Sequence, residues 1–566
     1  MEIVFKIFRM MALIFSCYGW IYWIIEKRKI KQEFSILILT SGIGSLMFFA
    51  GILNILELAS IGVFLTGMVW AFVSIREKKN PCEFITVGIA FFIIAAIFIL
   101  FLLYGTKVLR YDNFSHWAVV ARTIVKENRF PNFQDSIIMF QSYPPGSAAY
   151  IYYICRITGI NSEWMMLYAQ AIVILGALIP LFAFTKNKLA NNILVTITII
   201  FVLCSNIRLT DLCVDTLLTV VGAGGVLFCA YYNHRISKMY KHIIPILIFL
   251  VSIKNSGIFF VVVILAYMLV LCKWNEKRWK IILGLLLVPL STIFLWSQHV
   301  KLVFTSGMSA KHSMSVENLT SIFQGKTQED IVNIVKAYCE KVFSINNQFI
   351  YIFMIFVILF AFYKLVKKQS IIKRSILFMV LAYVGYQISL LGMYVFSMPT
   401  DEALNMASYE RYHITMIGFL FIVILPYIMV ALGMQKRKIL VISIIILLAY
   451  IIFSPQFEYL KRIRYETTER YQYEKIIQDN QIPHDSSYIF LQEDDDYGYS
   501  YYFYRYYFGT VNVAVYNKNQ LEDIGEQWRN YEYLIVLDET EESTEYLEDI
   551  LHTTPKERVI RLGEYK

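Results

Sequence analysis

The sequence predicts an all-α polytopic membrane protein of about 14 transmembrane helices, followed by a small C-terminal extracytoplasmic α/β domain. Of the 566 residues, 57% are hydrophobic, well above the roughly 45–50% that is usual in soluble globular proteins. The apolar residues form runs that approach the roughly 20 residues needed to cross a bilayer core of about 30 Å. These runs stop at Phe453, after which the chain is polar and charged.

The apolar runs divide the chain into a transmembrane domain, residues 1–454, and a C-terminal domain, residues 455–566. The spans at 243–254 and 257–272 are short, and they are separated only by a break at Lys254. The complete set of candidate spans is 8–25, 34–52, 57–75, 84–104, 165–184, 191–206, 212–232, 243–254, 257–272, 281–297, 347–364, 375–396, 413–433 and 439–454.

Lysine and arginine collect in every second loop between these spans. The basic clusters are 27–31, 76–79, 186–188, 235–241, 273–280, 364–374 and 436–438. The positive-inside rule places them in the cytoplasm, so the outer loops are 105–160, 298–345 and 397–412, and the C-terminal domain also lies outside. Lys6 and Arg9 do not fit, because the N-terminus would then face outward as well. We read the net charge of +9 as a topology signal in a multi-pass cell-membrane protein surrounded by lipid bilayer, and we expect no nucleic-acid partner.

The first large outer loop opens with the sequence Tyr-Asp-Asn-Phe-Ser-His-Trp at 111–117. The segment 117–126 is amphipathic at helical spacing, which is typical of a helix in the membrane interface. We interpret the Tyr-Pro-Pro-Gly sequence at 143–146 as the rigid turn that ends this helical segment. In the next large outer loop, Ser315 is placed to cap a further helix.

The C-terminal domain shows alternating helix and strand patterns, which are typical of an α/β fold. We predict helices at 458–479, at 499–508 and near Glu545, and strands at 488–492, 511–516 and 533–538. The acidic run at 493–498 resembles part of a calcium loop but lacks the full EF-hand pattern. We interpret it as a solvated turn.

Four polar clusters lie in segments that this topology places outside, and they supply the candidate site residues. They are the 111–117 segment with Asp112 and His116, the pair Asp211 and Asp215, the break at Lys254, and the group Glu402, Glu410, Arg411 and Tyr412. Transfer of a sugar from a polyprenyl phosphate needs a carboxylate base for the acceptor proton and cations for the departing phosphate. The four clusters contain both.

Asp112 is the candidate catalytic base, and it lies four residues before His116, which places both on one face if the segment is helical. The alternative for Asp112 is a helix N-cap, a position that aspartate favours. His116 has the chemistry to bind phosphate or a metal, although a histidine beside Trp117 is more often packed in the interface.

Each of the other clusters also has a simpler structural explanation. Asp215 begins a span, with Asp211 on the same face if the helix extends that far, and the helix dipole would stabilise either carboxylate there. Lys254 lies at a break where backbone groups can open toward a cavity, or it is a snorkelling side chain. Arg411 suits bidentate phosphate binding or a local pair with Glu410.

These features resemble the GT-C superfamily of integral membrane glycosyltransferases, which use polyprenyl-phosphate sugars. In that family the first large outer loop carries an acidic residue soon after a membrane helix, the place that Asp112 holds here. The Tyr-Pro-Pro-Gly sequence that begins with Tyr143, the aspartate at 215, the Lys-Asn-Ser-Gly break at 254–257 and the segment 402–412 are similar to features of bacterial members.

The resemblance covers residues 111–412 and implies transfer of a sugar from polyprenyl phosphate to a cell-surface glycan, lipid or protein acceptor, with Tyr143 among the substrate-binding residues. The C-terminal domain is similar to the extracytoplasmic domains that many members append. The paired acidic motif of the family is missing, since Asp112 is followed by Asn113 and Phe114. A single carboxylate is a poor divalent site, so the sequence requires no cofactor and leaves a divalent cation open.

Two other classes of protein stay open. A transporter or flippase for lipid-linked saccharides typically has repeat-related halves with matching broken helices, and the sequence shows one such break, at Lys254. A membrane sensor with a ligand-binding C-terminal domain would leave the charges of the 105–160 loop unexplained. We therefore favour the glycosyltransferase interpretation.

Overall fold

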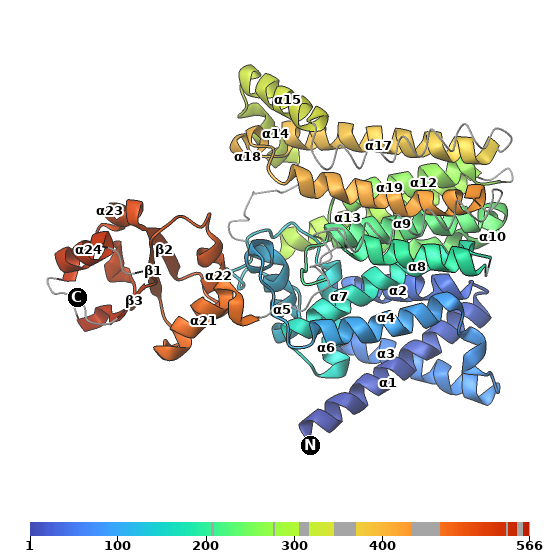
Figure 1. The fold of residues 1–566 in the computed structure, drawn as a ribbon, viewed down its shortest axis with the longest axis horizontal. Coiled ribbons are helices and arrows are strands. Elements are labelled where there is room, and N and C mark those ends of the chain that lie inside the picture. The colour runs from blue at the N-terminus through green and yellow to red at the C-terminus, as the bar shows by residue number, and fades with distance from the viewer. Residues whose placement is uncertain are drawn as a thin grey trace.

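The computed structural model describes residues 1–186, 188–204, 209–274, 278–304, 316–344, 370–432, 465–538, 541–551 and 558–564. Within these residues the protein is mainly helical, and its long helices run side by side along one direction (Figure 1). Seven of the described helices are long and apolar enough to cross a membrane. The prediction of a helical protein with membrane-length apolar helices is confirmed, whereas the predicted spans at 347–364 and 439–454 and the predicted cap at Ser315 lie outside the described residues.

The described helices follow the predicted spans closely. The helix α1 continues into the π-helical turn η1 (Trp23–Lys27), and α7 continues into the 3-10 turn η4 (Ile179–Phe184). The bounds are α1 Glu2–Tyr22, α2 Gln32–Ile52, α3 Leu56–Arg76, α4 Val87–Leu103, α5 Ala118–Glu127, α6 Gly146–Thr158, α7 Glu163–Leu178, α8 Leu189–Cys204, α9 Asp215–Tyr231, α10 Ile236–Met239, α11 Ile244–Ile253, α12 Gly257–Leu271, α13 Arg278–Val303, α14 Val316–Gln324, α15 Gln328–Phe343, α17 Ser370–Phe396, α18 Thr400–Leu404 and α19 Tyr409–Leu432.

The helices α2 and α7 form the centre of the bundle, and α1, α3 and α13 line its outside. The most apolar stretch is 78% buried in α2 and 83% buried in α7 with η4, but only 17% buried in α1 and 22% buried in α3 and α13. Large apolar side chains such as Phe8, Leu65 and Phe294 are therefore exposed on the outer helices. An apolar surface this extensive is typical of contact with lipid.

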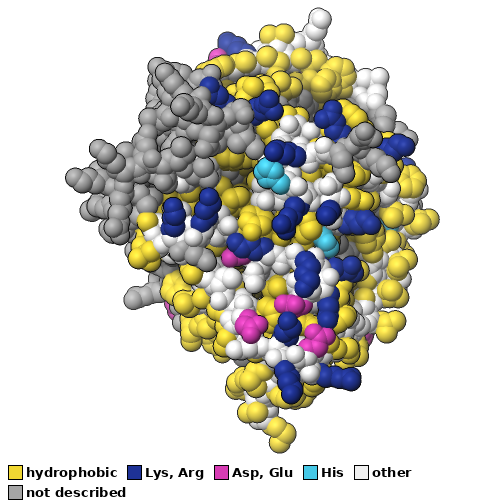
Figure 2. All heavy atoms as spheres, turned by 90° about the vertical axis from the view of Figure 1, so that its right-hand side faces the viewer, with side chains coloured by type: hydrophobic (Ala, Val, Ile, Leu, Met, Phe, Trp, Pro, Cys, Tyr) yellow, Lys and Arg dark blue, Asp and Glu magenta, His cyan; other side chains and the backbone are white. Residues whose placement is uncertain are grey.

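The basic loops gather at one end of the helices. Lys27, after α1, pairs with Glu77, after α3 (2.7 Å), and Lys31 donates to the carbonyl of Ala183 (3.4 Å). Figure 2 shows the end of the molecule that lies farthest from the C-terminal strands, and Lys and Arg clearly outnumber Asp and Glu on it. The sorting of loops to two ends agrees with the charge pattern of the sequence.

Arg9 departs from this pattern because the fold uses it at the opposite end. Its guanidinium donates to the carbonyl oxygens of Ile157 (2.7 Å) and Arg156 (2.5 Å) in the last turn of α6. A cation at a helix C-terminus satisfies carbonyls that have no partner within the helix, and it interacts favourably with the dipole. This contact with α6 explains why Arg9 lies at the opposite end, although the positive-inside rule would place it at the basic end.

The expectation that the Tyr-Pro-Pro-Gly sequence ends the preceding helix is wrong. The helix α5 ends much earlier, at Glu127, where Asn128 adopts a left-handed conformation (φ 55°). The sequence instead starts α6, with Pro145 at the N-cap and Gly146 as the first helical residue, and nearly all of α6 is buried. A Cβ on Gly146 would lie 2.3 Å from Oγ of Ser252 in α11, so glycine allows α6 to approach α11 there.

The helices α11 and α12 form a hairpin whose tip is Lys254. Lys273, just after α12, donates its backbone N–H to the carbonyl of Asn233 (3.2 Å), which precedes α11, so both feet of the hairpin lie at the basic end. Lys254 itself is extended. Gly257 permits the tight tip because a Cβ there would lie 2.0 Å from the carbonyl oxygen of Leu250. The predicted break at Lys254 is confirmed.

The C-terminal segment contains a four-stranded sheet of order β2-β1-β3-β4, in which β1 is parallel to β2 and β3, and β3 is antiparallel to β4. The first strand and the Tyr-rich helix α22 have the predicted bounds, whereas the described part of the first predicted helix begins only with α21, and the short β4 was not predicted. The bounds are α21 Glu469–Asp479, β1 Tyr488–Gln492, α22 Tyr499–Phe508, β2 Val513–Asn517, α23 Leu521–Ile524, β3 Tyr533–Val536, α24 Glu541–Leu551 and β4 Val559–Arg561.

Two exposed native cysteines test the orientation of the helices. Cys82 lies in the loop between α3 and α4, at the basic end, and Cys339 lies in α15, which packs beside α18 near the opposite end (Figure 1). If the basic end is cytoplasmic, a membrane-impermeant maleimide should label Cys339 in intact cells and Cys82 only after permeabilisation. Single-cysteine versions of the protein identify which site reacts, and labelling of Cys82 in intact cells would reverse the orientation.

Candidate functional site

Four charged side chains from distant parts of the chain meet at the end of the helices that faces the C-terminal sheet. Arg411 donates to Asp112 (Nη1–Oδ2, 2.7 Å), and its Nε lies 3.3 Å from Oδ2 of Asp215. Lys254 donates to the other carboxylate oxygen of Asp215 (Nζ–Oδ1, 3.0 Å). The result is a continuous chain of alternating charge, Asp112–Arg411–Asp215–Lys254, to which each of the four predicted clusters contributes one residue.

The inner half of this chain is closed and the outer half is open. The side chains of Lys254 and Asp215 are 10% and 9% exposed, whereas those of Arg411 and Asp112 are 32% and 37% exposed. The two cations and two anions balance. Burying an ion pair is favourable only if good geometry offsets the loss of hydration, and Asp215 meets this condition with two cationic partners at the N-terminus of α9, where the helix dipole also favours a carboxylate.

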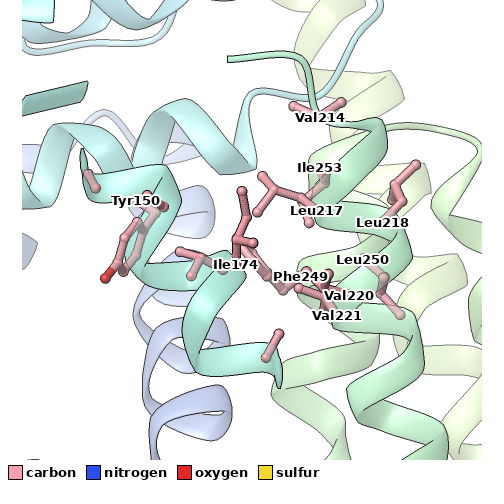
Figure 3. Close-up of a cluster of buried hydrophobic side chains, with 14 of the residues drawn as sticks. Tyr150, Ile174, Val214, Leu217, Leu218, Val220, Val221, Phe249, Leu250 and Ile253 are labelled. Atoms are coloured by element: carbon pink, nitrogen blue, oxygen red, sulfur yellow. The ribbon is translucent and has the colours of Figure 1, made fainter. Parts of the chain in front are cut away.

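An apolar core behind Asp215 and Lys254 fixes their backbones. Figure 3 shows side chains of α6, α7, α9 and α11 meeting in this core, with Ile174 of α7 directed toward α9 and α11. Val214 and Ile253, the residues directly before the two charged positions, belong to the same cluster and are fully buried. Because protein interiors are close-packed, neither charge can move far without repacking these helices.

Three aromatic residues from the candidate set surround the charges. The ring of Tyr412 lies under both cations, 5.2 Å from Nζ of Lys254 and 5.4 Å from the guanidinium carbon of Arg411. Tyr143 and His116 are packed together with ring centroids 5.3 Å apart. Burial, with a smaller contribution from the charge of Lys254, lowers the pKa of His116 to about 3, so its imidazole is neutral at physiological pH. A neutral ring enclosed by aromatic side chains fits the packing interpretation of His116 better than phosphate binding.

Asp211 belongs to a separate contact and not to the charged chain. The sequence places Asp211 and Asp215 on one face only if the helix extends to Asp211, and this condition is not met because α9 begins at Asp215. The Asp211 carboxylate accepts a hydrogen bond from the backbone N–H of Cys213 (2.9 Å) and lies 3.4 Å from Arg110. Burial raises the pKa of Asp211, and the hydrogen bond from Cys213 partly offsets this. The residue ties the entry of α9 to the segment that precedes Asp112.

The two glutamates of the last cluster lie at the edge of the site. Glu410 pairs with Lys341 of α15 (2.9 Å) with a side chain that is 60% exposed, while Arg411 pairs with Asp112 and Asp215. Glu402, in α18, lies near Tyr111: burial raises the pKa of Tyr111, and the charge of Glu402 adds to that increase. Neither glutamate is part of the alternating chain.

The structure tests the N-cap interpretation of Asp112. Among the described residues its carboxylate accepts no capping hydrogen bond from the π-helical turn η3 (Asn113–Trp117) that follows, and it accepts from Arg411 instead. Sequence reasoning missed Asn113, which accepts from the N–H of Leu212 (3.0 Å), and Gln170, which donates to the carbonyl of Asp211 (2.9 Å). A polar amide within an apolar run was the available signal for Gln170.

The described part of the chain contains no cluster of metal-binding side chains for a divalent cation. Within it, no three His, Cys, Asp or Glu side chains are grouped so that they could hold a metal ion. Asp112 and Asp215 are already paired with Arg411 and Lys254. Among the described residues, the cations beside these carboxylates are the side chains of Arg411 and Lys254.

The C-terminal segment holds the Asp112 loop through a buried ion network. Arg470 of α21 makes a bidentate contact with Glu163 at the start of α7 (2.8 and 2.9 Å) and also donates to the carbonyl of Val108 (2.6 Å). Glu163 accepts two further hydrogen bonds, from the backbone N–H of Val108 (2.8 Å) and from the hydroxyl of Tyr506 (2.9 Å). These hydrogen bonds join the C-terminal segment to the start of α7 and to the segment before Asp112. We call this contact between Arg470, Glu163, Val108 and Tyr506 the lock.

Aromatic packing completes this contact. Phe114, two residues after Asp112, lies against Tyr499, Phe503 and Tyr506 of α22 with ring centroids 5.4 to 5.5 Å apart. The hydroxyl of Tyr499 donates to the carbonyl of Leu109 (2.9 Å). The position of Asp112 is thus set from both sides, by α19 through Arg411 and by α22 through Phe114.

No family model, no curated protein and no solved structure matches this chain. The fold and the site define the protein only by its architecture. It has membrane-length apolar helices and a charge-balanced polar site at the end of the helices that carries the sheet.

Neutralising Asp215 should destabilise the protein, because Lys254 and Arg411 would then be close like charges without their shared partner. We expect Asp215→Asn to lower the free energy of unfolding by about 3 to 5 kcal/mol, the usual cost of removing one partner of a buried ion pair. Thermal unfolding of the purified protein in detergent measures this. The control is Glu410→Gln, which breaks an exposed pair of the kind that contributes little, and equal stability of the two variants would contradict the prediction.

The lock should weaken in acid, because Glu474 of α21 also accepts a hydrogen bond from Nε of Arg470 (2.8 Å). Burial raises the pKa of Glu474, but hydrogen bonds from Lys107 and Tyr465 and the charge of Arg470 outweigh it, so the pKa is lowered overall. The stability from such a carboxylate is fully present above the unfolded-state pKa of about 4.3, and it is lost as pH falls through the lower folded-state value.

Thermal unfolding of the wild type and Glu474→Gln between pH 7 and pH 3 tests this dependence. The wild type should be the more stable protein at neutral pH, and the difference should shrink as the pH drops below about 4.3. A difference that stays constant over the whole range would show that the charge of Glu474 does not stabilise the lock.

Proposed function

We propose that this protein is a membrane glycosyltransferase that moves a sugar from a polyprenyl-phosphate donor to a cell-surface acceptor on the outer face of the membrane. The observation that supports this best is the convergence of Lys254 and Arg411 beside the solvent-accessible carboxylate of Asp112. Two fixed cations suit a phosphate, and a carboxylate beside them suits an acceptor proton. The site lies at the ends of apolar helices, where a lipid-linked substrate has its headgroup.

Each charged residue then has one task. Arg411 and Lys254 bind the donor phosphate and stabilise the negative charge that develops on it as it leaves. An acceptor hydroxyl oxygen attacks the anomeric carbon, the bond from that carbon to the phosphate oxygen breaks, and the polyprenyl phosphate departs with the electron pair. Asp112 accepts the hydroxyl proton. Asp215 takes no part in the chemistry and holds both cations in position.

The balance of charge predicts how the donor enters. In the unliganded site the two cations are fully matched by Asp112 and Asp215, so an added phosphate competes with one of the carboxylates. Asp215 is buried and doubly paired, whereas Asp112 is 37% exposed and, among the described residues, has one cationic partner, Arg411. The phosphate should therefore take the place of Asp112 on Arg411, which releases Asp112 to act as the base.

Substitutions at Asp112 and at the cations should have opposite effects on donor binding. Asp112→Asn removes the competitor and the base, so polyprenyl phosphate should bind at least as tightly as to the wild type, while sugar transfer falls by about 10²-fold or more. Lys254→Ala and Arg411→Ala each remove a charge-assisted hydrogen bond and should weaken binding by about tenfold or more. Binding is measured with polyprenyl phosphate in nanodiscs, and transfer with a panel of polyprenyl-phosphate hexoses.

Glu410→Gln is the matched control for these variants, since it changes a charge next to Arg411 outside the alternating chain. The assignment fails if Lys254→Ala and Arg411→Ala bind polyprenyl phosphate like the wild type. Normal transfer by Asp112→Asn would remove Asp112 as the base. Donor binding without transfer to any acceptor in the wild type would favour a flippase.

A further inference from the structure

An aromatic surface lies directly beside Asp112 and is not explained by the donor site. Tyr111 is 40% exposed, and its ring stands edge-on to Tyr502 of α22 with centroids 4.8 Å apart. Tyr497, just before α22, is 90% exposed. Gly498, the residue after Tyr497, lies beside both other rings, since a Cβ there would be 3.7 Å from Tyr502 and 3.9 Å from Tyr111. Large aromatic side chains are costly to leave in water, and tyrosines gathered in this way suit a ligand that is partly apolar and partly polar.

The acidic turn at 493–498 builds this surface. Tyr497 and Gly498 both have left-handed backbones (φ 57° and 81°), and for tyrosine this conformation is uncommon. The turn is held by Asp496, which accepts from the N–H groups of Gly498 (3.1 Å) and Ser500 (2.7 Å), and by Asp495, which accepts from the N–H of Tyr497 (2.8 Å). The turn therefore holds Tyr497 in a strained backbone conformation with its ring in solvent. Backbone strain of this kind is typical of functional positions.

We propose that Tyr111, Tyr497 and Tyr502 bind the acceptor, and that the acceptor is a neutral or cationic glycan. This inference rests on the proposed function and specifies its acceptor class. One face of a pyranose ring consists of C–H groups, whose positive hydrogens complement the negative face of an aromatic ring. A glycan stacked on Tyr111 extends toward the neighbouring Asp112, where one of its hydroxyls loses its proton.

The surrounding charges select against an anionic glycan. Carboxylates flank the aromatic surface: Asp112 adjoins Tyr111, Glu402 approaches it from α18, and Asp495 supports Tyr497. The nearby cations Arg110 and Arg411 are paired with carboxylates of the protein. An acidic polysaccharide or an anionic lipid headgroup would meet like charge here.

A bilayer is the alternative occupant, since tyrosines are common at membrane interfaces. The placement of α22 favours the glycan, because the helix lies between the sheet and α5, beyond the ends of the long helices (Figure 1). Tyr104, at the end of α4 and 60% exposed, has the position of an interfacial tyrosine and is therefore the matched control.

The test uses Tyr497→Trp in the full-length protein in nanodiscs, with wild-type fluorescence subtracted. Maltohexaose (neutral) and a chitosan hexamer (cationic) should change the emission in a saturable way, hexagalacturonate (anionic) should bind at least tenfold more weakly, and brominated phospholipid should not quench it. In this background, Tyr111→Ala and Tyr502→Ala should each weaken oligosaccharide binding at least fivefold, and Tyr104→Ala should not.

The proposal is overturned if none of the three oligosaccharides binds, if the anionic one binds best, if brominated lipid quenches the reporter, or if the alanine variants bind normally. Tyr497→Ala, measured by calorimetry with the same ligands, covers the case in which a variant at Tyr111 or Tyr502 does not fold, since this ring is almost fully exposed and its loss cannot disturb the core. Binding of polyprenyl phosphate is measured separately. Donor binding without glycan binding refutes this proposal alone, and glycan binding without donor binding refutes only the transferase function.

Discussion

The carboxylate of Asp215 is the constraint on which the rest of the site depends. One oxygen accepts from Lys254 and the other faces Arg411, so a single buried anion links α9, the tip of the α11–α12 hairpin and α19. At low local dielectric, each of these cations would be very costly without a partner. The three elements are therefore fixed together, and Lys254 and Arg411 take their positions from this contact.

The sheet matters to this site because it determines where Asp112 lies. Asp112 comes soon after residues 106–110, which form neither a helix nor a strand. Instead, Arg470 donates to the carbonyl of Val108 and Phe114 lies within the aromatic cluster of α22, so the residues on both sides of Asp112 are held by the C-terminal segment. The C-terminal segment thereby positions a carboxylate at the end of the helical bundle, which explains how a loop residue can be placed accurately.

Local patterns in the sequence predict much of this arrangement. Apolar length gives most of the helix positions, and the Lys254 break is visible because a charge and a glycine interrupt an apolar run. The charge pattern correctly sorts Asp112, Asp215, Lys254 and Arg411 to one end, and this is enough to bring them within reach of one another. Charged residues in a chain that is otherwise apolar carry an unusually strong signal.

The errors arise where particular side-chain contacts, one of them local and the others between distant segments, decide the outcome. Asp211 satisfies a backbone N–H with its own side chain, a local bond that competes with helix formation, so α9 starts one turn later than its sequence allows. Arg9 lies at the end without basic loops because the carbonyls of α6, nearly 150 residues away in the sequence, need donors. The start of α6 depends on the space beside Ser252. None of these partners is visible from local pattern.

Two acidic residues make similar ion pairs that differ in the exposure of the arginine. Glu163 begins α7 and Asp215 begins α9, and each binds an arginine from a much later segment, Arg470 or Arg411. The chemistry is the same, but the side chain of Arg470 is 4% exposed, whereas that of Arg411 is 32% exposed. Arg470 has its donors directed at protein acceptors and holds the fold. Arg411 faces both a buried carboxylate and one that solvent reaches. In the function that we propose, a phosphate can therefore bind Arg411 without breaking the contact that keeps the helices together.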